Sequence, residues 1–327
     1  MYTFKIKYFN IFLKIKTNKK DKWESEMEEK GYGFAFLAGI TWGTIGIISY
    51  YLKQTGVGPF EIAFLRLFCA FLPMFIFYIF KDINKLKIKK ENIKHSLLIG
   101  VISQGMMGIG MYQCIVRTSV TVGVIMSCTG PLFTAILSKI FFNEKITLFK
   151  GLSLILGFYG AFLIVTGGDI SVLNTNGFGL FMGAISGLSY GFFPILSKRI
   201  PEGSNSLGIL IYSFLVGSIF IFPMLSTKVL IKALGPEMLI FSLMLGIIST
   251  ILAYIFYTKA LQIISPTKAA IVSLVELPTA AIIGHFFLKE YLHPINVLGI
   301  FILLGGVIIS KLKFPARENI KIKRKLF

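Results

Sequence analysis

One carboxylate stands in the middle of a long apolar stretch of this sequence. Glu276 lies ten residues after Pro266, in a run that is otherwise almost free of charge. An ionisable group at such a depth in a membrane is costly unless it is paired or faces water. Two interpretations therefore stand side by side. The carboxylate binds a cationic group or a proton in a cavity, or it is a structural group that is hydrogen-bonded between helices.

Aromatic and amide side chains occupy similar depths in other apolar stretches. An aromatic ring can stack on a ligand ring or cover a cation, and a mid-membrane amide is expected to face the interior rather than lipid. Core packing is the alternative for each ring, and Tyr257 raises the same question as its neighbours. The candidates for a substrate-binding cavity are Trp42, Gln104, Tyr112, Tyr190, Tyr254 and Glu276.

Three further charged residues are candidates for gates or for structural roles. Arg66 lies toward the outer end of its apolar stretch, where its long side chain can reach the interface or meet Glu61 in a salt bridge. We favour a structural role for it. Glu144 and Glu290 each end an apolar stretch at matched positions, which indicates boundary or gate residues.

The sequence does not indicate other chemistry. The cysteines Cys69, Cys114 and Cys128 lie inside apolar stretches without a paired spacing, as small packing residues do. The histidines lack metal-ligand spacing, and neither a phosphate-binding glycine loop nor a nucleophile constellation is present. We therefore predict a protein that is not an enzyme and needs no metal or cofactor.

The elements that position these residues are predicted to cross a membrane. The chain has 327 residues, of which 55% are hydrophobic and 15% charged, and its mean hydropathy is +0.77. A soluble domain carries far more charge, about 25%. The net charge of +19 does not indicate nucleic-acid binding, because the basic residues lie in short breaks between apolar stretches.

A helix needs about 20 apolar residues to cross a bilayer, and ten stretches of the sequence meet that length. Together they predict an all-α membrane protein of ten transmembrane helices. The predicted spans are 32–52, 60–80, 95–115, 120–142, 148–166, 177–196, 207–225, 238–257, 267–288 and 295–312.

The basic residues also predict an orientation. With the N-terminus inside, the inner segments hold 28 of the 34 lysines and arginines and the outer loops hold five, while Arg66 lies within a span. The positive-inside rule then places both termini in the cytoplasm. The basic tail 1–30 either lies on the membrane surface as an amphipathic segment or precedes a natural start at Met27.

The two halves of the sequence repeat each other. A shift of 146 residues aligns Gly100 with Gly246, Ser127 with Ser273 and Glu144 with Glu290, and a shift of 144 aligns the openings. Because five spans are an odd number, the second copy enters the membrane from the other side, and such inverted repeats suit alternating access around a central site. The predicted units are a first repeat at 31–168, a second repeat at 177–312 and a basic tail at 313–327.

Several motifs recur in this order. Span two begins with Phe64-Leu-Arg-Leu-Phe68, and span four ends with Pro131-Leu-Phe-Thr-Ala-Ile-Leu-Ser-Lys-Ile-Phe-Phe-Asn-Glu144. Span nine contains Glu276-Leu-Pro-Thr-Ala-Ala-Ile-Ile-Gly-His-Phe-Phe-Leu-Lys-Glu290, and span ten contains Gly299-Ile-Phe-Ile-Leu-Leu-Gly-Gly-Val307. Over residues 31–312 the chain resembles the EamA family of the drug/metabolite transporter superfamily. One departure is Glu276-Leu277-Pro278, where the family pattern has glutamate directly before proline.

The resemblance implies a secondary transporter of small metabolites in the cytoplasmic membrane, often for amino acids or related compounds and commonly outward. It also implies that spans one, three, four, six, eight and nine line the cavity. A channel or a receptor-like protein without active transport is the alternative. The expected partners are a small-molecule substrate and the lipid bilayer, not nucleic acid, and the oligomeric state stays open.

Overall fold

The computed structural model describes residues 25–201 and 203–312, and these residues form helices and their connections. Most of the N-terminal tail and the basic C-terminal segment, for which the sequence analysis made predictions, lie outside the described residues. Within the described residues, nine helices are long and apolar enough to span a membrane, and α16 (Pro294–Ile309) is a shorter apolar helix. The prediction of an all-α membrane protein is confirmed, with the count of ten spans as an approximation.

The first five spans run alternately up and down through the bundle. They are Ser25–Gln54, whose second part is α2 (Ile45–Gln54), then α3 (Pro59–Lys81), the helix Lys90–Arg117 that contains α4 (Lys90–Leu98) and α5 (Met107–Arg117), the pair α6 (Val120–Ser127) and α7 (Gly130–Phe142), and α8 (Leu148–Thr166).

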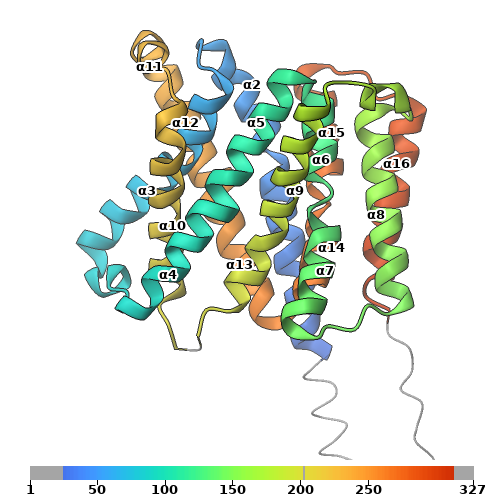
Figure 1. The fold of residues 1–327 in the computed structure, drawn as a ribbon, viewed down its shortest axis with the longest axis horizontal. Helices are drawn as coiled ribbons and strands as arrows, with labels where there is room; N and C mark the ends of the chain where they lie inside the picture. The colour runs from blue at the N-terminus through green and yellow to red at the C-terminus, as the bar shows by residue number, and fades with distance from the viewer. Residues whose placement is uncertain (1–24, 202, 313–327) are drawn as a thin grey trace, which may run out of the picture.

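The second five spans repeat this arrangement upside down. They are α9 (Gly177–Lys198), α10 (Ser206–Ile221), the helix that contains α12 (Pro236–Gly246) and α13 (Ala253–Ile263), the pair α14 (Pro266–Ser273) and α15 (Glu276–Leu288), and α16. The first span rises from the lower end of the bundle in Figure 1, whereas α9 descends from the upper end, so the repeats are inverted.

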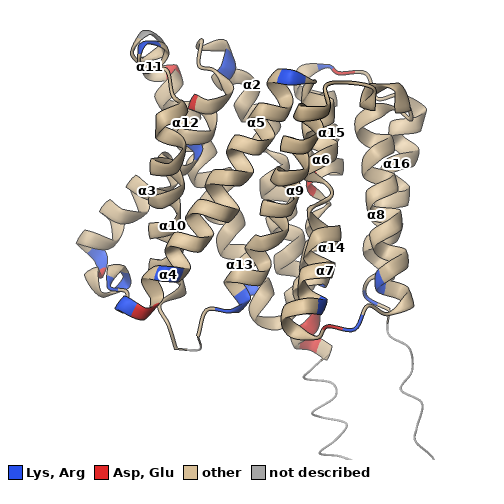
Figure 2. Cartoon of the chain, viewed as in Figure 1, with Lys and Arg blue, Asp and Glu red and all other residues tan. Residues whose placement is uncertain are grey.

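We call the end where the first span begins and α16 ends the terminal face, and the other end the opposite face (Figure 1). Figure 2 shows that lysine and arginine gather mainly at the terminal face, while the middle of the bundle is nearly free of charge. One feature of the opposite face was not predicted from sequence. The short helix α11 (Thr227–Ala233) lies in the connection between α10 and α12.

Matched irregularities mark the repeat within the helices themselves. Span four is interrupted between α6 and α7 and span nine between α14 and α15, at positions that the 146-residue shift relates. π-Helical turns occupy 99–106 in span three and 247–252 in span eight. Asn143 and Lys289 both end their helices in the left-handed conformation, with φ of 51° and 55°. π-Helical turns and interrupted membrane helices commonly occur at functional sites.

Glycines bring the first span of each repeat close to the interrupted helix of the other repeat. A methyl group on Gly43 would lie 2.8 Å from the backbone oxygen of Glu276, and one on Gly191 would lie 2.9 Å from the backbone oxygen of Gly130. Small residues at helix interfaces allow such approach in membranes. The glycines of spans one and six therefore allow tight packing between the two repeats.

The most extensive helix contact joins α8 to α16, the last spans of the two repeats. We expect Gly160→Ala to lower the thermal stability of the protein, because its methyl group would lie 2.6 Å from the backbone nitrogen of Leu303. Overpacking of this kind typically costs about 1–3 kcal/mol. The measurement is the melting temperature in detergent. Gly151→Ala, in the same helix with open space around it, is the matched control. Equal melting temperatures for the two variants would contradict the close contact.

Candidate functional site

Aromatic side chains from three spans meet at the centre of the bundle. The Trp42 ring lies 6.1 Å from that of Tyr190, 5.4 Å from that of Tyr254 and 5.0 Å from that of Tyr257, centroid to centroid. Phe193 completes the group, with its ring edge-on to Tyr254 at 4.7 Å. We call these five residues the aromatic cluster. Edge-to-face pairs of this kind contribute about 0.5–1.5 kcal/mol each beyond burial.

Trp42, Tyr190 and Tyr254 are candidates from the sequence, and the structure brings them together. Tyr257 raised the same question as the other tyrosines but was not among the candidates, and Phe193 was not singled out. A signal for Tyr257 was available, because it lies one helical turn after Tyr254 and therefore shares its face. Phe193 is one apolar residue among many in its span, and no spacing in the sequence distinguishes it.

Gln104 ties the third span to this cluster. Its side-chain oxygen accepts a hydrogen bond of 3.1 Å from the Tyr254 hydroxyl, and both side chains are buried. The Gln104 Nε2 amide is also buried and has no hydrogen-bond partner among the described residues. Leaving a buried donor unpaired costs about 1–3 kcal/mol. The amide therefore marks a place where a further acceptor would be stabilising.

Glu276 lies beside the cluster, at the first residue of α15, where span nine is interrupted. Its side chain is half-buried, and within the described part of the chain it forms neither a hydrogen bond nor an ion pair. Its backbone oxygen lies against Gly43, the residue that follows Trp42, which brings it next to the aromatic cluster. The interhelical hydrogen bond that one interpretation of Glu276 requires is thus not formed in this structure.

The repeat counterpart of Glu276 is Gly130, and the structure gives a physical reason for that difference. The Tyr190 ring fills the space where a side chain of Gly130 would begin. A glutamate at both positions would therefore displace a member of the aromatic cluster. The site is asymmetric because one repeat supplies a carboxylate where the other admits a ring.

We expect Gly130→Ala to move Tyr190 away from Trp42. In a Trp23→Phe background, Trp42 is the remaining tryptophan, so its fluorescence reports on the cluster. The emission spectrum should shift in Gly130→Ala. It should stay unchanged in Gly46→Ala, the matched control, because that glycine has open space around it. An unchanged spectrum in both variants would show that Tyr190 does not depend on Gly130.

Tyr112, the remaining cavity candidate, lies away from the aromatic cluster. Its ring lies 5.9 Å from that of Phe60, at the start of α3. Arg66 is half-buried and does not pair with Glu61, whose carboxylate accepts a hydrogen bond of 2.8 Å from the backbone N–H of Ser226. Glu61 instead ties α3 to the connection that follows α10.

Glu144 connects the two repeats at the terminal face. Its carboxylate accepts hydrogen bonds from Ser265 at 2.6 Å and from Thr267 at 2.9 Å, both at the start of span nine. Lys150 forms an ion pair with it at 2.6 Å, and the Ser138 hydroxyl also donates to it. We call these five residues the terminal latch. Sequence reasoning identified Glu144 but not the residues that it binds.

The ionised form of Glu144 is favoured in the terminal latch. Burial alone would raise the pKa of this carboxyl, but hydrogen bonds from Lys150, Ser138 and Ser265 outweigh burial and hold the pKa below its ordinary value. A depressed pKa gives stability that is present above the ordinary pKa of glutamate and lost as the pH falls through the lowered pKa. The latch is therefore intact at neutral pH and weakens only under acid conditions.

Glu290, the counterpart of Glu144, makes no such connection. It is exposed at the opposite face, although its backbone N–H bonds to Gly284 as that of Glu144 bonds to Ser138, both at 3.3 Å. Ser119, the counterpart of Ser265, accepts a hydrogen bond from the N–H of Val122 and caps its own helix. Ser265 makes no cap bond, since its hydroxyl donates to Glu144.

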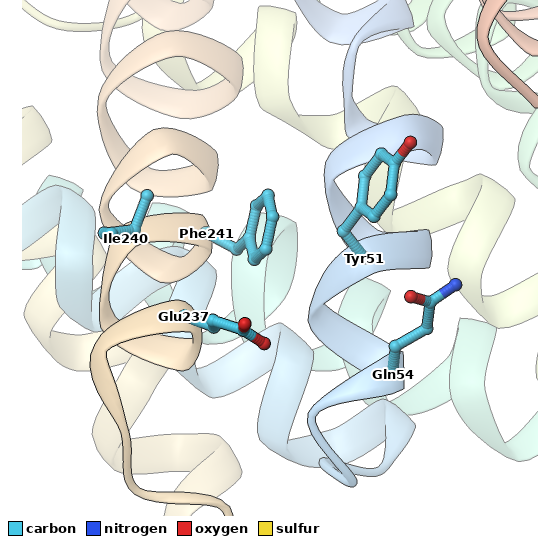
Figure 3. A pocket seen from close by; sticks show the side chains of 5 residues that line it. All are labelled: Tyr51, Gln54, Glu237, Ile240 and Phe241. Carbon is cyan, nitrogen blue, oxygen red and sulfur yellow. The ribbon is translucent and has the colours of Figure 1, made fainter.

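A groove opens near the opposite face between α2 and α12. Figure 3 shows the rings of Tyr51 and Phe241 facing each other across it, and their centroids lie 5.4 Å apart. Gln54, Glu237 and Ile240 complete its lining. It contains none of the residues that the sequence predicted for substrate binding.

Two copies of one family model match the chain. The model of the EamA-like transporter family matches residues 29–166 and again residues 177–312. The chain belongs to the EamA-like transporter family. Membership makes it a membrane protein that transports small molecules, and the resemblance found in the sequence is confirmed.

Relatives in the EamA-like family are named as transporters. An uncharacterized transporter of Archaeoglobus fulgidus is 24% identical and covers 81% of this chain and 92% of its own length. An S-adenosylmethionine uptake transporter of Rickettsia felis is 25% identical and covers 88% of this chain and 96% of its own length. A solved crystal structure is 12% identical with a TM-score of 0.68, covering 86% of this chain and 96% of its own, which supports the fold.

The departure from the EamA pattern in span nine leaves the helix geometry intact. Pro278 is the third residue of α15, and Pro131 is the second residue of α7. Both prolines therefore lie in the first turn of a helix, where the backbone N–H has no partner within the helix. Moving the proline by one residue does not move the interruption of the span.

Proposed function

We propose that the chain is a secondary transporter that works by alternating access around the aromatic cluster and Glu276. One observation supports this most directly: the terminal latch is formed, whereas its counterpart at the opposite face is not. In an inverted-repeat transporter, two conformations arise when the repeats exchange their arrangements. A chain with only one of two equivalent latches formed has the asymmetry that such a mechanism requires.

The exchange can be written residue by residue. The 146-residue shift relates Ser265 to Ser119 and Thr267 to Thr121, so Glu290 would bind Ser119 and Thr121 in the other conformation. We call these three residues the mirror latch. Ser119 would release its helix cap, and Ser265 would regain one. Each conformation then keeps one latch and one serine cap. The mirror latch lacks the ion pair, because the counterparts of Lys150 and Ser138 are Asn296 and Gly284.

Orientation follows from the charges. The positive-inside rule places the terminal face, with most of the lysines and arginines, in the cytoplasm, and with it both termini. Under this proposal the described conformation is closed toward the cytoplasm. Two further contacts support closure there: Lys268 pairs with Glu28 at 2.7 Å, and the Lys198 ammonium donates to the backbone oxygen of Leu261 at 2.5 Å.

The proposed substrates are small metabolites, namely amino acids or related compounds, and the proposed direction is export across the cytoplasmic membrane. The Rickettsia relatives are named as transporters of S-adenosylmethionine, an amino-acid derivative, which supports this class. Those relatives are named for uptake. Measurements of efflux and uptake are therefore needed to decide the direction of transport.

Counterflow in proteoliposomes tests the function. A comparison of metabolites inside and outside cells, with and without overexpression, first supplies the compound. A carrier that alternates exchanges labelled for unlabelled compound, so substrate on one side accelerates movement from the other. A channel or a receptor-like protein shows no trans-stimulation, and that result would overturn the proposal.

A further inference from the structure

Arg66 is a charged group inside a membrane span that has no partner among the described residues. It lies seven residues after the start of α3, about 10 Å along the helix axis. Within the described part of the chain, no ion pair or hydrogen bond joins its guanidinium to another residue. Its nearest acid in sequence, Glu61, is already engaged by Ser226. Arginines at such depth normally face the protein interior or a water-filled cavity.

The position of Arg66 on α3 points toward the central site. Ala63, one turn earlier, lies against Gly108 of α5, and Phe60 lies against Tyr112 of the same helix. Residues three apart on a helix share a face, so Arg66 faces the same neighbour. Leu67, the next residue of α3, and Gln104 both lie against Gly217, so Arg66 lies at the depth of Gln104. Its charge acts on Tyr112, Tyr254 and Glu276.

Glu276 and Arg66 are thus two opposite charges near the central site that do not pair with each other. Both are half-buried, and their charged atoms are more than 4 Å apart, since they do not form a salt bridge. Unpaired charges away from bulk water are unfavourable, and each therefore favours a counter-charge. A ligand between them can satisfy both when it carries a negative group toward Arg66 and a positive group toward Glu276.

The unpaired amide of Gln104 supports a ligand in this place. It is fully buried and is held against Tyr254, which lies within reach of both charges. Its free Nε2 donor would complete its hydrogen bonding on a carboxylate or carbonyl oxygen. Arginine can likewise bind a carboxylate through two parallel hydrogen bonds. The nearby aromatic faces suit the cationic end or a ring of the ligand.

We propose that Arg66 and Glu276 are the two poles of one binding site, which takes a ligand bearing both an anionic and a cationic group, as an amino-acid zwitterion does. This inference rests on the proposed function and deepens it. It changes the interpretation of Arg66, which the sequence favoured as a structural residue, to a residue that determines specificity.

The test measures binding to the purified protein by thermal stabilisation with the standard amino acids. Each amino acid that binds is compared with its methyl ester, which lacks the anion, and with its N-acetyl derivative, which lacks the cation. We expect the wild type to bind the zwitterion at least about tenfold more tightly than either derivative, as one lost charged contact predicts.

The variants assign each pole. Arg66→Gln should bind the acid no better than the ester, Glu276→Gln should bind it no better than the N-acetyl derivative, and Arg66→Lys should keep a preference for the acid. The proposal is wrong if no amino acid binds, or if Arg66→Gln weakens the acid and the ester equally. Counterflow of another compound would then leave the proposed function standing, whereas absent trans-stimulation would overturn that function regardless of binding.

Discussion

Replacing Glu276 by glutamine is expected to reduce transport roughly 10- to 100-fold, because a charge-assisted contact worth about 1.5–3 kcal/mol is lost from the site. Glutamine keeps the shape of the side chain, so the interruption between α14 and α15 should persist. The measurement is the initial rate of counterflow in proteoliposomes at matched protein content. Glu276→Asp keeps the charge but shortens the reach, and its rate should lie between those of the wild type and the glutamine variant.

The control is Glu91→Gln, an exposed glutamate whose pairing with Lys89 is long, at 3.8 Å. Exposed ion pairs of this kind contribute little, so its counterflow rate should equal that of the wild type. Trp42→Ala supplies a second test of the same site, because its ring contacts three of the tyrosines. Unchanged transport in both Glu276→Gln and Trp42→Ala, in protein that is still folded, would show that the site lies elsewhere.

The architecture could be predicted because the bilayer dictates it. Apolar runs of about 20 residues fix the spans, and an odd number of spans in each repeat fixes their inversion. Two helix starts could also be predicted, since Pro266 and Pro294 each begin a helix in the structure. The π-helical turns could not be predicted, because they differ from the α-helix only in their backbone hydrogen bonds and the apolar sequence gives no sign of that change.

The candidate site could be predicted only in part from the sequence. A polar residue at mid-membrane is visible in a sequence, so Glu276 and Gln104 could be named. The rotation of a helix about its axis is not visible, so the sequence alone could not decide whether Arg66 has a structural role or faces the central site. The latches show a deeper limit. Glu144 and Glu290 lie at matched positions, yet only the carboxylate of Glu144 is bonded. Part of that difference lies in the residues, because the counterparts of Ser138 and Lys150 are Gly284 and Asn296. Under the proposed function the rest belongs to the conformation.

Glu144→Ala is expected to shift the protein toward the conformation that is open at the terminal face. The substitution removes an ion pair and three hydrogen bonds from a largely buried group. A loss of about 2–3 kcal/mol is reasonable for such a group, and it changes the balance of the two states roughly 30- to 150-fold. The variant should still fold, because the latch lies at one end of the bundle.

Two reporter cysteines measure this shift, one at each face of the bundle, by their rates of labelling. They are introduced into a chain whose buried cysteines are replaced by alanine. Thr267 belongs to the terminal latch and is 1% exposed, so Glu144→Ala should accelerate the labelling of Thr267→Cys by an impermeant maleimide. Thr121→Cys lies on the mirror latch, and the same substitution should slow its labelling. Glu290→Ala should move both rates in the reverse direction, because it removes the latch of the other conformation.

Reciprocity is what separates a switch from local loosening. If Glu144→Ala merely frayed the terminal face, Thr267→Cys would label faster while Thr121→Cys kept its rate, and alternating access through these latches would be refuted. The pH dependence of the labelling rate tests independently whether the ionised Glu144 carboxylate holds the latch closed. Because bonding lowers the pKa of Glu144, acid below the ordinary range of glutamate should accelerate labelling of Thr267→Cys relative to the Glu144→Ala background at the same pH. A pH-independent ratio would mean that the ionised carboxylate does not hold the latch closed.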